Sequence, residues 1–378
     1  MGTDKRLRIA LIAGTLGRAG AEKQLWYMAR ALRGSGVDVR MYSVTQGEHY
    51  EALFCAEGLK PWWFGQSPSS VRRLVALAQE LRKFKPHIVQ SAHFFTNLYS
   101  GLAGRSCGAL TIGAMRNDAQ YELADNGRWG RLLLRTPAAL IANSQAAVEG
   151  AVAVGVPASK LQFLANVIDL SEFDLRMGAS VPRAEDTAPT VIAIGRLVQA
   201  KRFDRFLEAF ALARRSVPEL RATLVGDGPE RANLEQKAAT LGLYESLVFQ
   251  GARDDVPAQL RKADMLALSS EHEGFPNVVL EAMSASLPVV ATPAGDAGRI
   301  VQEGETGFVV PFENSEAMAE RLVHLAKSPA LRQQFGTAAR KRVEEHYSYG
   351  VLSEQLLGLY RKMAQQHHHQ NLLRLLPQ

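Results

Sequence analysis

Short apolar runs alternate with amphipathic stretches along most of this chain, and this alternation restricts its possible folds most strongly. A short apolar run suits a strand buried on both faces, and an amphipathic stretch suits a helix that covers a sheet. Repeated βαβ units with parallel sheets are therefore expected. The alternation occurs in two series, which open with Arg8–Ala13 and Thr190–Ile194. The predicted fold class is α/β, with two Rossmann-like domains.

Each series predicts its own set of elements. The first predicts a helix over Ala21–Leu32 and strands at Arg8–Ala13, Val39–Val44, His87–Gln90, Thr111–Met115, Ala139–Ala142 and Leu161–Ala165. The second predicts strands at Thr190–Ile194, Ala222–Val225, Leu247–Phe249, Met265–Ser269, Pro288–Thr292 and Val309–Pro311, and helices over Phe203–Arg215, Glu230–Thr240, Pro276–Ser286, Ser315–Lys327, Pro329–His346 and Tyr349–Lys362. Open parallel sheets bind ligands at the carboxyl ends of their strands, so two facing sheets predict a ligand in an interdomain cleft.

The boundary between the series lies where periodicity is lost. Between Asp169 and Pro189 the chain collects Pro, Gly, Ser and acidic residues, as an interdomain linker does. We therefore predict a first domain over 1–170, a linker over 171–189, a second domain over 190–348, and a C-terminal helix with a tail over 349–378 that crosses back toward the first domain. We interpret His367–His369 as solvated tail. Asn371–Leu376 is weakly amphipathic and could touch a membrane, and we favour a loose terminus.

Composition excludes several classes of protein. A chain of 378 residues with 47% hydrophobic residues is not disordered, and two distant cysteines, Cys55 and Cys107, exclude a disulfide scaffold and give no support to a zinc site. Residues 1–180 hold 21 Lys/Arg against 14 Asp/Glu, which gives them a net charge of +7. The net charge of the whole chain is +6, so all of the basic excess lies in this first part. This excess indicates either an anionic partner, such as a membrane surface or charged acceptor, or an ordinary solvated basic surface.

One basic stretch suits contact with a membrane surface. Arg72-Arg73 and Arg82-Lys83 flank a predicted helix with apolar residues between them, as in helices that dock at lipid interfaces. No apolar run approaches the length of a membrane-spanning helix. We therefore expect a cytoplasmic protein that is peripheral at the inner face of the membrane.

Glycine follows the first strand of both series. In the first, Gly14, Gly17 and Gly20 precede a helix that would aim unpaired N–H groups at an anion, and a tight strand-to-helix turn explains the same residues. The loop is neither a P-loop nor a GxGxxG fingerprint. In the second series, Gly195 is followed by Arg196 and Lys201, two cations that can neutralise a diphosphate or belong to a solvated turn.

The most informative segment is Glu271–Glu281. Glu273 is followed by Gly274, Phe275, Pro276 and Asn277, and Glu281 lies one turn after Asn277. Because Pro suits the first turn of a helix, free N–H groups are expected at the positive end of a helix that begins there. Such an end holds a phosphate, while the two carboxylates can accept hydrogen bonds from sugar hydroxyls.

Together these motifs resemble the family 4 retaining glycosyltransferases of the GT-B fold, also called glycosyl transferases group 1. The resemblance covers nearly the whole chain and is thin between Glu48 and Ser144. It rests on Glu273-Gly-Phe-Pro-Asn…Glu281, Gly195-Arg-Leu…Lys201, Gly226-Asp-Gly-Pro229, Phe249-Gln-Gly251, Pro288-Val-Val290, Gly304-Glu-Thr-Gly307, Asn166-Val-Ile-Asp169 and Gly20-Ala-Glu22. It implies a glycosyltransferase that moves a sugar from a UDP- or GDP-sugar to a glycan or lipid-linked acceptor in surface polysaccharide or lipopolysaccharide synthesis.

The resemblance also implies residue roles. Arg196 and Lys201 would hold the donor diphosphate, Glu281 the ribose and Glu273 the transferred sugar. Backbone N–H groups of Gly274, Phe275 and Asn277 around Pro276 would complete these contacts, the Phe249–Arg253 loop with Gly251 and Arg253 would hold the base, and Gly17 and Gly20 would approach the phosphates. The chain contains no D-x-D triplet, the usual carboxylate site for a metal on a nucleotide sugar. We therefore expect no metal and no cofactor. The resemblance further implies that the configuration of the anomeric carbon is retained, because the acceptor attacks it on the face from which the phosphate leaves.

The acceptor side is expected in the first domain. His93 ends a predicted strand and could orient the acceptor or help move a proton, or it is a structural histidine. Arg116 stands where family members often carry a second histidine, and because it cannot act as a base, a diphosphate or anionic acceptor is its expected partner.

Two alternatives use the same motifs. A nucleotide-sugar epimerase of the GT-B fold would need acid and base residues on both faces of the sugar, and the donor motif contains no such pair. A noncatalytic nucleotide-sugar-binding or scaffolding subunit would not need Glu273, Glu281, Arg196 and Lys201 together. We predict the transferase, with Glu273, Arg196, Lys201 and His93 as its catalytic residues and Glu281 as a donor-binding residue.

Overall fold

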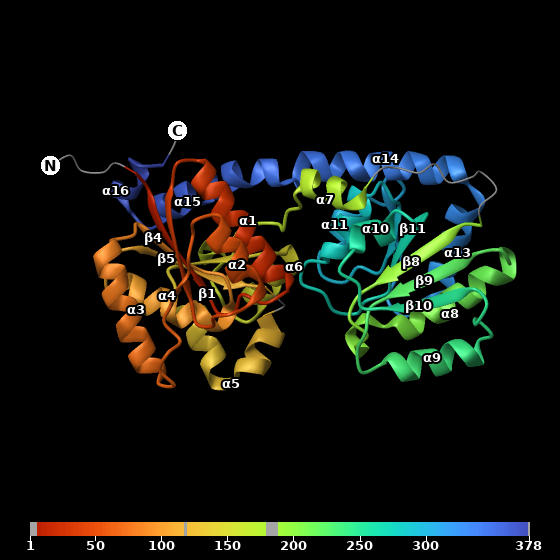
Figure 1. The fold of residues 1–378 in the computed structure, drawn as a ribbon, viewed down its shortest axis with the longest axis horizontal. Helices are drawn as coiled ribbons and strands as arrows, with labels where there is room; N and C mark the ends of the chain where they lie inside the picture. Colours follow the sequence, from red (N-terminus) through yellow and green to blue (C-terminus); the bar gives the residue numbers. More distant parts are fainter. Residues whose placement is uncertain (1–5, 117–118, 179–187, 377–378) are drawn as a thin grey trace. The chain divides into compact units, whose positions relative to one another are not determined.

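The structure, a computed structural model, describes residues 6–116, 119–178 and 188–376. The chain divides into two compact units, one formed by Met1–Asn166 with Tyr349–Gln378 and the other by Val167–Ser348 (Figure 1). Each unit contains one fully parallel sheet covered by helices. Two α/β units with parallel sheets confirm the predicted fold class.

Seven strands form the sheet of the first unit, in the order β3-β2-β1-β4-β5-β6-β7. They are β1 (Arg8–Ala13), β2 (Asp38–Ser43), β3 (Trp62–Trp63), β4 (Ile88–Ser91), β5 (Leu110–Met115), β6 (Ala139–Ala142) and β7 (Leu161–Phe163). Six helices connect them: α1 (Gly20–Gly34), α2 (His49–Ala56), α3 (Ser70–Phe84), α4 (Asn97–Arg105), α5 (Ala119–Arg135) and α6 (Gln145–Ala153). Every residue of β4, β5 and β6 is buried, as expected for strands covered by helices on both faces.

The sheet of the second unit has six strands in the order β10-β9-β8-β11-β12-β13. They are β8 (Thr190–Ile194), β9 (Arg221–Val225), β10 (Leu247–Gly251), β11 (Met265–Leu268), β12 (Val289–Ala291) and β13 (Gly307–Val309). The helices are α7 (Leu170–Met177), α8 (Phe203–Ser216), α9 (Arg231–Thr240), α10 (Val256–Leu260), α11 (Asn277–Ser284), α12 (Ala297–Ile300), α13 (Ser315–Lys327) and α14 (Pro329–His346). Phe206 and Phe210 of α8 and Leu322 of α13 lie in its hydrophobic core.

Both sheets reverse their strand order at an equivalent place. In the first unit β1 lies between β2 and β4, and in the second β8 lies between β9 and β11. The chain thus adds strands first on one side of the central strand and then on its other side. In open α/β sheets ligands bind at this switch point, outside the carboxyl ends of the strands. The loops after β1, β4, β8 and β11 are therefore where function is expected.

The C-terminal segment belongs to the first unit. Its helix α15 (Leu352–Gln366) buries Leu352, Leu356, Tyr360 and Met363, one apolar stripe at helical spacing. The Tyr360 hydroxyl donates to Gln90 Oε1 of β4 at 2.6 Å. Our interpretation of the following residues as a loose tail is wrong for the described part: α16 (Gln370–Leu373) follows, and Leu372 is buried.

The predicted linker also differs from the structure. Part of it forms α7. Asp169 caps the N-terminus of this helix, because its side chain accepts a hydrogen bond from Glu172 N–H at 3.1 Å. Arg340 of α14 donates to both carboxylate oxygens of Asp174 in α7, which fixes this helix on the second unit. The Pro- and acid-rich residues 179–187 of the predicted linker lie outside the described residues.

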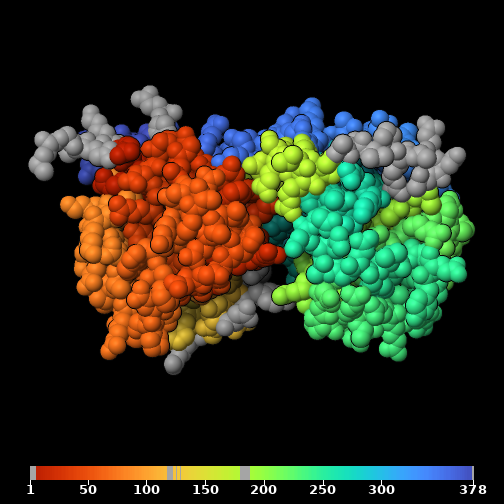
Figure 2. Space-filling model, viewed as in Figure 1, coloured from red at the N-terminus to blue at the C-terminus, as the bar shows by residue number. Residues whose placement is uncertain are grey.

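Helix α3 presents a mixed basic and apolar surface. Arg72, Arg82 and Lys83 are exposed, and so are Val71 (70%) and Val75 (50%). Figure 2 shows this orange segment at the surface of the first unit. No helix of the described residues is long and apolar enough to cross a membrane.

Candidate functional site

Lys201 and Glu273 form the centre of the site in the second unit. Lys201 ends a short 3-10 helix (Gln199–Lys201) in the loop after β8, and Glu273 lies in the loop after β11, the neighbouring strand. Lys201 Nζ donates to Glu273 Oε1 at 2.6 Å, and Ser270 Oγ donates to the same oxygen at 2.7 Å. Both side chains keep some exposure, 25% for Lys201 and 10% for Glu273. The pair thus places a mobile positive charge and a fixed carboxylate at the switch point.

Glycine allows the loops around this pair to approach closely. At Gly226, with a φ of +146°, a Cβ atom would lie 1.8 Å from the carbonyl oxygen of Gly195. At Gly295, with a φ of +55°, a Cβ atom would lie 2.3 Å from the carbonyl oxygen of Gly274. Any larger residue would force these loops apart. The close packing therefore fixes the backbone on both sides of Lys201 and Glu273.

Helix α11 begins at Asn277, shortly after Glu273. Pro276 is its N-cap residue rather than a residue of its first turn, so the predicted start was one residue early. Proline has no side-chain group that could cap this end, and a helix N-terminus carries a partial positive charge. Phe275 is buried, with its ring 6.1 Å from that of Tyr347. Asn277 and Glu281 lie one turn apart on the helix and are partly buried.

The remaining predicted donor residues lie at the same edge of the sheet. Arg196 is exposed in the loop after β8. Gly251 ends β10, and its carbonyl oxygen accepts from Gly226 N–H at 2.8 Å, which joins the ends of β10 and β9. Arg253 is exposed and donates through Nε to Asp255 Oδ1 at 2.8 Å. This hydrogen bond lowers the pKa of Asp255 to about 2, so the carboxylate stays charged beside the guanidinium.

His93 lies at the switch point of the first unit. Its Nδ1 accepts from the backbone N–H of Gly14 at 3.0 Å, so this nitrogen carries no hydrogen. The hydrogen of the neutral ring then lies on Nε2, which donates to Glu22 Oε1 at 3.2 Å. Both ring nitrogens are thus engaged by the protein itself. The protein's own groups thus orient the ring, and a role of His93 as a base stays a prediction.

Glu22 is the principal residue of this cluster that sequence reasoning left without a role. It lies in the first turn of α1, is 4% exposed, and also accepts from the Thr15 hydroxyl. Burial raises its pKa, but the hydrogen bonds from His93 and Thr15 outweigh burial and leave the pKa below its usual value. Its Oε2 is buried without a hydrogen-bond partner in the described part of the chain. The motif Gly20-Ala-Glu22 contained the signal, but nothing in the sequence showed that this carboxylate meets His93.

Arg116 directly follows β5, close to this cluster. Its Nε donates to the carbonyl oxygen of Ala92 at 3.1 Å. Burial lowers its pKa to about 10, and the charge of Glu22 opposes that shift, so the guanidinium stays charged at neutral pH. Arg116 therefore balances the buried charge of Glu22. Its predicted contact with a diphosphate or anionic acceptor stays a prediction, and sequence reasoning did not identify Glu22 as its neighbour.

The glycine loop after β1 is held by a second carboxylate. Leu16 N–H and the Thr45 hydroxyl both donate to Glu48. Gly17 has open space where a Cβ atom would lie, and Gly20 begins α1, whose N-cap Ala19 offers no capping side chain. The N–H groups of Gly14 and Leu16 thus donate to side chains of the same unit. The segment from Gly17 to Gly20 is therefore the part of this loop that is the candidate for contact with an anion.

Two family profiles together match most of the chain. The profile described as "Glycosyltransferase Family 4" matches residues 18–172, and the profile "Glycosyl transferases group 1" matches residues 180–342. A "GDP-mannose-dependent alpha-mannosyltransferase" of Mycobacterium tuberculosis is 30% identical over 75% of each chain. The "Lipopolysaccharide core biosynthesis glycosyltransferase LpsE" of Rhizobium meliloti is 30% identical over 46% of this chain and 49% of that protein. With several such relatives, including an "Alpha-D-kanosaminyltransferase" of Streptomyces kanamyceticus, the match spans about half of their length.

Solved structures share this fold over almost their full length. Anabaena HepE, crystallised in complex with UDP and glucose, superimposes with a TM-score of 0.80 at 20% identity, covering 94% of this chain and 99% of that chain. The lipopolysaccharide outer core galactosyltransferase WaaB in its apo form has a TM-score of 0.77 at 18% identity and covers 94% and 100%. These neighbours confirm the GT-B fold.

Proposed function

Because the chain belongs to glycosyltransferase family 4, we propose that it transfers a sugar from a nucleotide-sugar donor to a glycan or lipid-linked acceptor, with retention at the anomeric carbon. The observation that carries this proposal is the Lys201–Glu273 pair near the N-terminus of α11, whose N-cap residue is Pro276. A cation and a helix N-terminus suit a diphosphate, and a partly exposed carboxylate suits sugar hydroxyls. One small site thus offers partners for both halves of a nucleotide sugar.

The donor would be held by the second unit. Lys201 exchanges its contact with Glu273 for the diphosphate, and Arg196, exposed in the same loop, adds a second cation. Glu273 then accepts from hydroxyls of the transferred sugar, and Glu281 from the ribose. Backbone groups from Gly274 to Asn277 complete the contacts, and the Gly251–Arg253 loop holds the base. HepE in complex with UDP-glucose and the GDP-mannose-dependent relative make UDP- and GDP-sugars the donors to test first.

The chemistry would require little beyond electrostatic stabilisation. The bond between the anomeric carbon and the phosphate oxygen breaks, and the acceptor oxygen forms its bond on the same face. The departing phosphate takes the proton of the acceptor hydroxyl. Lys201, Arg196 and the N-terminus of α11 stabilise the charge that develops on the diphosphate, which is the main route to catalysis in such a site. These groups supply that charge without a metal.

Donor screening followed by cleavage tests this function. Binding of a nucleotide sugar should raise the melting temperature of the protein, and the donor that does so should be hydrolysed slowly or transferred to crude lipid acceptors. Tight binding without cleavage or transfer would indicate a noncatalytic subunit instead. Conversion of the bound donor into another nucleotide sugar would indicate an epimerase.

We further propose that the first unit contacts an anionic membrane surface where a lipid-linked acceptor resides, as a peripheral cytoplasmic protein. The support is α3, where exposed Arg72, Arg82 and Lys83 accompany the exposed Val71 and Val75. Such a face suits a lipid interface because cations meet headgroups while apolar side chains enter the boundary. Flotation with vesicles that contain phosphatidylglycerol should recover the wild type and lose the variant with Arg72, Arg73, Arg82 and Lys83 changed to Gln. Absence of the wild type from the floated fraction would contradict the proposal.

A further inference from the structure

Arg202 lies directly after Lys201 in a backbone conformation that is unusual for a long side chain. Its φ of 49° and ψ of 41° place it in the left-handed region, which favours glycine. It is also the N-cap residue of α8, yet its side chain makes no capping hydrogen bond. A residue that is unfavourable for its backbone conformation needs a compensating contact. The guanidinium of Arg202 makes such contacts.

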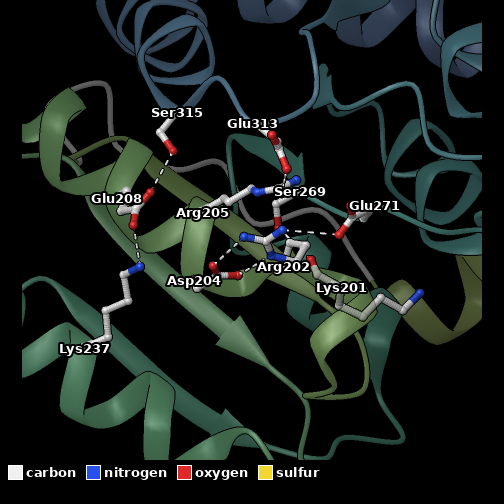
Figure 3. A network of polar contacts seen from close by, with 10 residues as sticks. All are labelled: Lys201, Arg202, Asp204, Arg205, Glu208, Lys237, Ser269, Glu271, Glu313 and Ser315. Carbon is white, nitrogen blue, oxygen red and sulfur yellow. Dashed lines mark hydrogen bonds and ion pairs between the residues drawn. The ribbon is translucent and has the colours of Figure 1, made fainter.

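The guanidinium joins two carboxylates from different elements. Nε and Nη2 of Arg202 donate to the two oxygens of Asp204 at 3.0 and 2.9 Å, and Nη1 donates to Glu271 Oε2 at 3.2 Å. Figure 3 shows the guanidinium between these two carboxylates. Asp204 belongs to the first turn of α8, whereas Glu271 lies in the loop after β11. A planar fork suits this double contact, and an ammonium group would not reproduce it.

The loop reached by Arg202 is the loop that carries Glu273. Glu271 N–H donates to the carbonyl oxygen of Ala200 at 2.9 Å, and Ser269 Oγ donates to that of Lys201 at 2.9 Å. Arg202 therefore adds a side-chain link to two backbone-directed links between the same loops. The Lys201–Glu273 pair lies immediately beside these three links.

We propose that Arg202 is a positioning residue that fixes Lys201 and Glu273 for the donor diphosphate and sugar by joining the loops after β8 and β11. This inference rests on the proposed function, because it assumes that these two residues bind the donor. When Lys201 turns from Glu273 toward a diphosphate, the ion pair between the loops is lost. The Arg202 link to Glu271 then remains as the charged link and, with the two backbone-directed hydrogen bonds, keeps the loops in register while the donor is bound.

The neighbouring part of the network provides matched controls. Lys237 donates to Glu208, and Ser315 Oγ donates to the other oxygen of Glu208 at 3.0 Å, which places a second charged link on α8. As Figure 3 shows, this link lies at the far end of the network from Lys201. Loss of the Lys237 charge removes a similar ion pair from the same helix without touching either donor loop.

The test compares Arg202→Gly with Lys237→Met. Glycine favours the left-handed conformation, so Arg202→Gly removes the link while the fold is retained, as the melting temperature checks. We expect its dissociation constant for UDP or GDP, whichever the wild type binds, to rise about fivefold, the size of a good partly exposed ion pair. Binding of the corresponding nucleoside, uridine or guanosine, should not change. Arg202→Lys should recover part of the loss, and Lys237→Met should bind as the wild type does.

Glu271→Gln provides a second variant that removes the negative charge of the link from the other side with almost no change in shape. Unchanged diphosphate affinity in both Arg202→Gly and Glu271→Gln would overturn the positioning role, as would equal weakening of nucleoside binding. Lys201→Ala separates this failure from that of the proposed function. If Lys201→Ala also binds the diphosphate normally, the donor site itself is assigned wrongly; if it loses binding, only the role of Arg202 fails.

Discussion

The switch points of the two units have the same topology but hold different chemistry. In the second unit, the partly exposed Lys201 and Glu273 join the loops after β8 and β11. In the first, Glu22 and His93 join α1 to the loop after β4, with side-chain exposures of 5% and 12%. The two pairs differ most in their cationic or basic member, because Lys201 is 25% exposed and can exchange its carboxylate for a ligand, whereas His93 is held by contacts on both ring nitrogens. This difference supports our proposal of a donor site in the second unit and a scaffold of polar groups in the first.

The largest effect is expected from Lys201→Ala. Removal of this cation takes away the charge that would stabilise the departing diphosphate, and turnover should fall about 100-fold or more. Steady-state kinetics with the donor identified by screening would measure this fall. The control Lys237→Ala removes a paired lysine elsewhere in the same unit and should leave turnover near that of the wild type. Equal turnover in Lys201→Ala and the wild type would contradict the donor assignment.

The variant His93→Asn tests the comparison between the two switch points in the first unit. The amide oxygen of Asn can accept from Gly14 N–H in place of Nδ1, so most of the orientation is kept. If His93 only orients the loop, turnover should fall less than about tenfold, whereas loss of a general base costs about 100-fold or more. A fall of the larger size, with an altered pH profile, would restore the role of His93 in proton transfer.

Glu22→Gln should reduce stability more than it changes donor affinity. The change removes a buried charge that faces Arg116, at a cost of about 2 kcal/mol in the free energy of unfolding. Chemical denaturation measures this cost, and calorimetry with the nucleoside diphosphate measures donor affinity. Strong loss of donor affinity at unchanged stability would show that the cluster binds ligand directly.

The pH dependence of this difference has a defined sign. The pKa of Glu22 in the folded protein lies below its ordinary value of 4.5, so the ionised carboxylate stabilises the fold above that value. The contribution is lost as the pH falls through the lowered pKa. Wild type and Glu22→Gln should therefore differ most near neutral pH and converge in acid. A difference that grows in acid would contradict the assignment of the charge to Glu22.

Sequence alone predicted the elements whose signal is local. Apolar runs such as Arg8–Ala13 and Thr190–Ile194 matched strands, and the predicted group of Lys201, Glu273 and Asn277 lies at one sheet edge because their loops follow adjacent strands. Contacts set by tertiary packing were missed. The Glu22–His93 contact spans 71 residues, and the Arg202–Glu271 contact spans 69. Neither residue spacing nor composition contains that information.

The same reason explains the error at the C-terminus. The segment after Gln366 has a weak local pattern, and its burial comes from packing beside α15 on the first unit. Tyr360, buried with its hydroxyl on Gln90, marks this attachment, and burial raises its pKa. Tyr360→Phe should lower the free energy of unfolding by about 1 kcal/mol, the smallest of the expected effects, because Gln90 loses one donor. An unchanged stability would show that the hydrogen bond contributes nothing to this attachment.

The most direct test of the donor assignment is the anomeric configuration of the product. The protein is incubated with the nucleotide sugar that raises its melting temperature most, and nuclear magnetic resonance follows the sugar released or transferred at early times. Our account predicts cleavage with the anomeric configuration of the donor retained, and loss of that cleavage in Lys201→Ala. A product of inverted configuration, or binding without any cleavage in the presence of lipid acceptors, would contradict it.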